Sequence, residues 1–114
     1  MRILYGISSA GLDPTWRARG ILAGLVALGH EVRIATAGRT AAILGAHGFE
    51  VIDLAGDVES ALEQGLRFQP DVVLTDFSYF ACLVARLAQV PCLPLGRETR
   101  RAAAGSYGRA TRRS

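Results

Sequence analysis

The stretch Asp71-Val72-Val73-Leu74-Thr75 decides the fold, because it contains an unbroken apolar run of strand length. A run in which polar and apolar residues do not alternate is typical of a parallel strand that helices cover on both faces. We therefore predict a central parallel strand here. Asp76 follows directly, and we expect it to cap a helix that runs through Gln89.

Strand and helix patterns alternate through the rest of the body. The predicted strands are Arg2–Ile7, Glu31–Thr36, Glu50–Leu54 and Val90–Leu95, and the other predicted helices cover 13–28, 39–47 and 58–68. Such alternation implies right-handed crossovers and a parallel sheet. The predicted fold is α/β: a Rossmann-like, doubly wound sheet of five parallel strands in the order 3-2-1-4-5.

Asp13 and Pro14 form the clearest helix start in the chain. An aspartate at the cap position accepts hydrogen bonds from free backbone N–H groups, and proline at the first helical position loses no hydrogen bond. Gly20 and Gly24 lie inside the same predicted helix, where each glycine costs roughly 1 kcal/mol relative to alanine. We expect these two glycines to pack closely against the sheet.

Charge divides the chain after Gly96. Residues 1–96 contain seven Arg and nine Asp or Glu, giving −2, and residues 97–114 contain six Arg and one Glu, giving +5, which together make the net charge of +3. The predicted domain is 1–96, and the basic tail 97–114 is expected to be disordered because it has no apolar periodicity. An acidic body argues against a nucleic-acid partner. The tail either stays solvated or meets nucleic acid, an anionic membrane or an acidic partner.

Cys82 and Cys92 are the only cysteines, and neither belongs to a C-x-x-C pair. With two distant histidines they make a poor zinc set, so we predict no metal and no cofactor, and we expect buried free thiols. Free thiols suit a reducing cytosol. The longest apolar run, Gly20 to Gly29, is too short for a transmembrane segment, and the start is interpreted as a strand rather than a signal peptide. These features predict a cytoplasmic protein, with peripheral membrane association left open.

The predicted ligand site lies beyond the carboxyl ends of the first and fourth strands, where the strand order of a doubly wound sheet reverses. The candidate catalytic residues are two carboxylates, Asp13 and Asp76, and each is also a natural helix cap. The candidate substrate-binding residues are Ser8, Ser9, Gly11, Trp16, Arg17, Phe77 and Tyr79. Trp16 and Tyr79 combine an apolar face with a polar group. The first loop lacks both G-x-G-x-x-G and the P-loop ending, so its nucleotide signal is weak.

Residues 7–36 resemble a subfamily of bacterial and archaeal two-domain (GT-B) glycosyltransferases whose first loop reads G-L-G-H-A-T-R. The letters that match are Gly11, Leu12, Arg17 and Gly29-His30-Glu31-Val32, and Phe77 completes the D-F that follows the family's fourth strand. The family's Gly-His pair is replaced by Asp13-Pro14. The family's histidine is a plausible base for an acceptor hydroxyl, a role that Pro14 cannot fill, whereas Asp13 could.

The resemblance implies an amino-terminal, acceptor-side glycosyltransferase domain, whose family normally adds a second domain for the nucleotide-sugar. The chain of 114 residues leaves no room for it. The leading hypothesis is a stand-alone domain: either the acceptor-side subunit of a split enzyme, completed by a donor-domain chain and binding a sugar or hydroxylated acceptor, or an inactive truncated relative. Eukaryotic dolichol-linked sugar synthesis, which uses separate halves, is a precedent. The alternatives are a non-enzymatic small-molecule or partner-binding Rossmann-like module, and a truncated reading frame.

Overall fold

The structure, a computed structural model, describes the backbone of residues 1–8, 13–76 and 78–95. It also describes the side chains of these residues, except for those of residues 13–17. The predicted site residues Ser9, Gly11 and Phe77 lie outside the described residues, as does the tail 97–114 whose disorder was expected.

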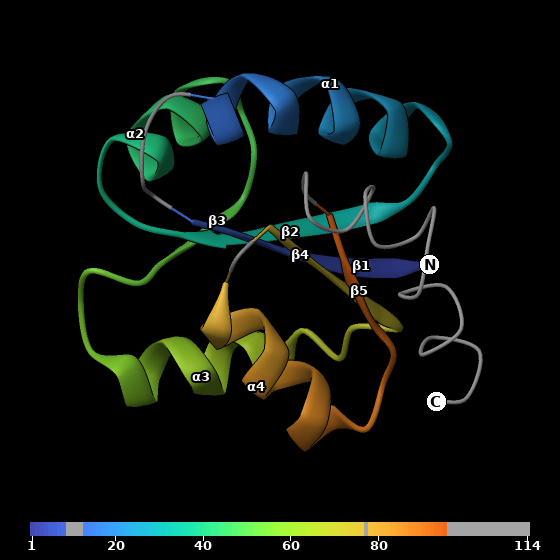
Figure 1. The fold of residues 1–114 in the computed structure, drawn as a ribbon, viewed down its shortest axis with the longest axis vertical. Helices are drawn as coiled ribbons and strands as arrows, with labels where there is room; N and C mark the ends of the chain where they lie inside the picture. The colour runs from blue at the N-terminus through green and yellow to red at the C-terminus, as the bar shows by residue number, and fades with distance from the viewer. Residues whose placement is uncertain (9–12, 77, 96–114) are drawn as a thin grey trace, which may run out of the picture.

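Five parallel strands form one sheet in the order β3-β2-β1-β4-β5, which confirms the predicted fold class and topology (Figure 1). The strands are β1 (Arg2–Ile7), β2 (Glu31–Thr36), β3 (Val51–Asp53), β4 (Val72–Asp76) and β5 (Cys92–Pro94). The helices are α1 (Asp13–Ala27), α2 (Gly38–Ala46), α3 (Val58–Arg67) and α4 (Tyr79–Ala88). In Figure 1, α1 and α2 cover one face of the sheet, and α3 and α4 cover the other.

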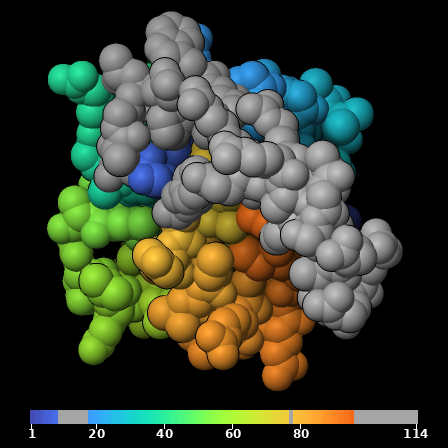
Figure 2. All heavy atoms as spheres, viewed as in Figure 1, coloured from blue at the N-terminus to red at the C-terminus, as the bar shows by residue number. Residues whose placement is uncertain are grey.

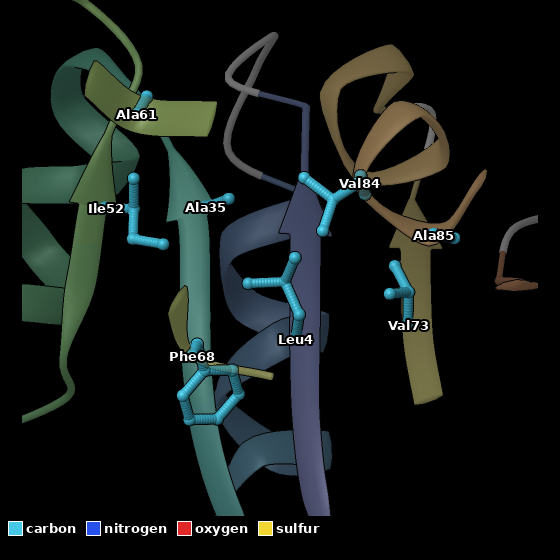
Figure 3. Close-up of a cluster of buried hydrophobic side chains, with 9 residues drawn as sticks. Leu4, Ala35, Ile52, Ala61, Phe68, Val73, Val84 and Ala85 are labelled. Atoms are coloured by element: carbon cyan, nitrogen blue, oxygen red, sulfur yellow. The ribbon is translucent and has the colours of Figure 1, made fainter. Parts of the chain in front are cut away.

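Each face of the sheet carries its own apolar core. Successive residues of a strand point to opposite faces. Leu4 and Val73 therefore pack with Phe68 and Val84 on the α3–α4 side, as Figure 3 shows. The core on the α1–α2 side contains Tyr5, Ile7, Ala18, Leu22, Ile34 and Leu44, with Leu74 packed against it. The apolar run in β4 is thus explained, because its neighbouring residues enter two different cores.

The start of α4 differs from the prediction. The helix begins at Tyr79, and Asp76 is the last residue of β4, where it pairs with Ile7 of β1. Ser78 is the N-cap, since its Oγ accepts a hydrogen bond from the Ala81 N–H at 3.2 Å. The expectation that Asp76 caps α4 is therefore wrong: pairing with β1 extends the strand through Asp76, and the next side chain able to cap is Ser78.

Gly20 and Gly24 lie exposed on α1 instead of against the sheet. A Cβ atom built on either residue would meet nothing within 4 Å. The expectation of close packing at these glycines is therefore wrong, because the buried face of α1 is formed by Ala18 and Leu22, which are both 0% exposed.

Gly20→Ala and Gly24→Ala are each expected to raise the free energy of unfolding by about 1 kcal/mol, because alanine favours the helix and no neighbour opposes its methyl group. Urea unfolding followed by circular dichroism measures the change. Gly29→Ala is the matched control, since Gly29 has φ +88° and alanine there is strained. A loss of stability at Gly20 or Gly24 would contradict the exposed placement.

Candidate functional site

The carboxyl ends of β2, β1 and β4 form one edge of the sheet and are tied together there. The Thr36 Oγ1 donates a hydrogen bond to the Ile7 carbonyl at 2.8 Å. The Ser8 N–H donates to the Asp76 carbonyl at 3.0 Å, one residue beyond the strand pairing. The strand order reverses between β1 and β4, so this edge is where a doubly wound sheet binds ligands.

Buried polar side chains gather at this edge. In the described part of the chain they are Thr36, Thr40, Thr75, Asp76 and Ser78, all at or shortly after the carboxyl ends of β2 and β4. Burying a polar group is costly unless it is hydrogen-bonded. The Thr75 Oγ1 accepts from the Ser78 N–H at 2.9 Å and donates to the Ser78 carbonyl at 3.0 Å. Of these five residues, only Asp76 was predicted to belong to the site. Thr36 and Thr75 lie near the ends of predicted strands, and this position could have marked them as candidates too.

Asp76 is fully buried, at 0% exposure. It pairs with Ile7, and residues in register on neighbouring strands point to the same face. Since Ile7 belongs to the core under α1 and α2, the Asp76 side chain lies on that side of the sheet. The carboxylate is therefore on the face that α1 covers, and α1 begins at Asp13.

Tyr79 lies on the opposite side of the sheet and is 94% exposed. It lines a groove of about 270 Å³ together with Leu54, Val58, Phe80 and Leu83. The groove lies where α3 and α4 meet, and their surfaces adjoin in Figure 2. Asp76 and Tyr79, which were both predicted to belong to one ligand site, are thus on different faces of the sheet.

The remaining candidates divide between the two ends of the first loop. Ser8 is partly buried at the edge, where its N–H is bonded to Asp76. Asp13, Trp16 and Arg17 lie in the first two turns of α1, and the structure describes their backbone only. The structure therefore brings Ser8 and Asp76 together, and Asp13 to the start of the helix on the same face as Asp76.

Within residues 1–8, 13–76 and 78–95, no three His, Cys, Asp or Glu side chains are arranged to hold a metal ion. No helix in the described part of the chain has both the length and the apolar character needed to cross a bilayer.

A second cleft, of about 440 Å³, lies at the amino ends of β1 and β2 and includes Arg2, Arg33 and Arg67. Each arginine forms an ion pair with a glutamate: Arg2 with Glu31 at 3.5 Å, Arg33 with Glu50 at 3.7 Å, and Arg67 with Glu63. Each of these positive charges is therefore matched by a nearby carboxylate.

Residues 1–58 match the model of Glycosyl transferase family 1, and the chain belongs to this family. No curated protein gives a significant match to the sequence.

Solved glycosyltransferases share the fold. Glycosyltransferase VinC in complex with dTDP is similar at a TM-score of 0.64 and 16% identity, over 81% of this chain and 33% of that one. MurG of Acinetobacter baumannii is similar at a TM-score of 0.62 and 16% identity, over 90% of this chain and 38% of that one. SsfS6 of Streptomyces sp. SF2575 is similar at a TM-score of 0.59 and 21% identity, over 90% of this chain and 42% of that one. The likeness is one of fold, and the chain spans less than half the length of each of these proteins.

Proposed function

We propose that this chain supplies the acceptor side of a GT-B glycosyltransferase and that a second chain with a donor-binding fold completes the enzyme. One observation carries the proposal. The fold aligns over 81% to 90% of this chain but over only 33% to 42% of the three glycosyltransferases. The chain thus corresponds to one part of such an enzyme.

Glycosyl transfer requires an acceptor hydroxyl to attack the sugar's anomeric carbon, with loss of a nucleotide and transfer of the hydroxyl proton to a base. We propose Asp13 as that base, since Pro14 has no group that accepts a proton. Asp76 is the second candidate, because it ends β4 at the edge of the sheet where the strand order reverses. Ser8, Ser9, Gly11, Trp16, Arg17, Phe77 and Tyr79 remain the proposed acceptor-binding residues.

The charge of the edge bears on the kind of ligand. Asp13 is the first residue of α1, and a negative charge there opposes the attraction that a helix amino terminus exerts on a diphosphate. A neutral, hydroxyl-rich acceptor is therefore favoured over a free nucleoside diphosphate. The chain alone is expected to show no sugar transfer when it is assayed with nucleotide-sugars and hydroxylated acceptors.

Nuclear magnetic resonance titration of the full chain with sugars, nucleotides and nucleotide-sugars tests the proposed site. Amide shifts with a sugar are expected at Ser8, Ser78 and Tyr79. Asp76→Asn is expected to weaken binding about tenfold, the usual worth of a hydrogen bond to a charged group. Asp53→Asn is the control, because Asp53 also ends a strand but is exposed and accepts a hydrogen bond from the nearby Ala55 N–H, at 2.9 Å.

Three outcomes would count against parts of the proposal. Shifts that cluster around Asp53 while the edge stays silent would mean that the site is elsewhere. Tight binding of a free nucleoside diphosphate beside Asp13 would contradict the charge argument but not the topology. A complete absence of shifts with every sugar would favour an inactive relative.

A further inference from the structure

Cys82 of α4 and Cys92 of β5 face each other where the helix lies against the edge of the sheet. The Cys92 thiol donates a hydrogen bond to the Cys82 Sγ across 3.8 Å. Both cysteines are free and only partly buried, so the expectation of buried thiols is corrected in this respect. β5 has three residues and pairs with β4 alone among the described strands. The two sulfurs therefore join a helix to a short edge strand.

We propose that Cys82 and Cys92 form a reversible disulfide when a low-molecular-weight disulfide, such as glutathione disulfide, oxidises them. The bond would fix α4 to β5. Since α4 carries Tyr79 and is capped by Ser78 at the carboxyl-end edge, the bond would also fix the helix that borders the groove.

The geometry favours the bond. A disulfide places its sulfurs about 2.05 Å apart, so the pair must close a gap of less than about 2 Å. Rotation of the two side chains between rotamers moves each sulfur by a distance of this size. The helix and the strand are already in contact, so no large movement of the backbone is required.

The reaction proceeds by two exchanges. The Cys82 thiolate attacks a sulfur of glutathione disulfide, which forms a mixed disulfide and releases one glutathione. The Cys92 thiolate then attacks the Cys82 sulfur and displaces the second glutathione. Two cysteine thiols are oxidised, one glutathione disulfide is reduced to two glutathione thiols, and the two protons end on glutathione.

The environment of Cys92 sets this order. Burial, followed by the hydrogen bond and the charge of Cys82, raises the pKa of Cys92 to about 12. Cys92 is therefore a poor nucleophile toward a disulfide in solution, because the thiolate is the reacting form and burial disfavours it. Burial still raises the pKa of Cys92 once Cys82 is in a mixed disulfide, but the Cys92 sulfur lies beside the sulfur that it attacks, and this proximity makes it the resolving thiol.

Peptide mapping of the full chain tests the proposal. The reduced protein is incubated with excess glutathione disulfide, blocked with iodoacetamide and cut with trypsin, which separates the two cysteines at Arg86. Peptides 68–86 and 87–97 are expected to be joined and two hydrogen atoms lighter than their sum. The Tm is expected to rise by on the order of 10 °C, as closing a short loop predicts, and dithiothreitol should reverse both changes. Recovery of the two peptides separately, or joined only between chains, would overturn the proposal.

Serine variants separate the two steps. Cys92→Ser is expected to take up one glutathione at Cys82, whereas Cys82→Ser should take up much less at Cys92, and neither should gain in Tm. Equal uptake by the two variants would overturn the assigned order. Circular dichroism of both variants establishes that they keep the native fold.

Discussion

Gly6→Ala is expected to lower the free energy of unfolding by about 3 kcal/mol or more, as overpacking in a closely packed core does. Gly6 lies inside β1, under the first turn of α4. A Cβ atom there would lie 2.3 Å from the Ala81 Cβ and 2.9 Å from the Ser78 Cβ. Neither neighbour is the end of a long side chain that could turn away, so α4 would have to move off the sheet. Tyr79 would move with it, and any ligand bound at the edge should be lost.

Urea unfolding followed by circular dichroism measures this effect. Gly45→Ala is the matched control, because Gly45 lies in α2 and a Cβ atom there would meet nothing within 4 Å. Gly45→Ala is expected to gain about 1 kcal/mol, as at other exposed helix positions. Near-native stability of Gly6→Ala beside that gain would show that α4 does not approach β1 as closely as the structure has it.

Phe68→Ala is expected to cost about 3–5 kcal/mol, the usual loss when a core phenylalanine is truncated. The side chain is 6% exposed and packs beside Leu4 in the core under α3 and α4 (Figure 3). Its ring also lies 4.8 Å from the Arg33 Cζ and 6.0 Å from the Arg2 Cζ. Alanine would leave a cavity and remove the aromatic face from both guanidinium groups.

Phe68→Leu separates volume from aromatic character. Leucine keeps most of the buried volume but not the contact with the arginines, so a smaller loss of about 1 kcal/mol is expected. The Arg2 Nη1 donates a hydrogen bond to the backbone carbonyl of residue 68 at 3.1 Å, and this bond is available in both variants. Equal losses in the two variants, measured by urea unfolding, would mean that the cation–ring contacts and not the buried volume carry the effect.

Local patterns in the sequence were enough for the secondary structure and the sheet. The bounds of β1 and β2 agree with the predicted ranges: β1 is followed by Ser8, and β2 begins after the turn residues Gly29 and His30. The strand order followed from alternating strands and helices with right-handed crossovers. The resemblance to glycosyltransferases rested on local motifs as well, and the family match over residues 1–58 supports it.

Local patterns failed where two interpretations of one residue compete. Asp76 and Ser78 are both able to cap a helix, and only the pairing of Asp76 with Ile7 assigns the cap to Ser78. Gly20 suggested close packing, yet the position of α1 on the sheet leaves it exposed. The glycine that a helix does approach closely is Gly6, and its surroundings come from a segment more than seventy residues away.

The sequence by itself determined the elements, their order and the family, since these depend on apolar runs, caps and motifs within single segments. The tertiary structure alone decided which side chains meet. It put Asp76 and Tyr79 on opposite faces of the sheet, and it brought Cys82 of α4 to 3.8 Å from Cys92 of β5. The physical reason is that the direction of a side chain is set by strand register and by helix packing, which join residues distant in the chain.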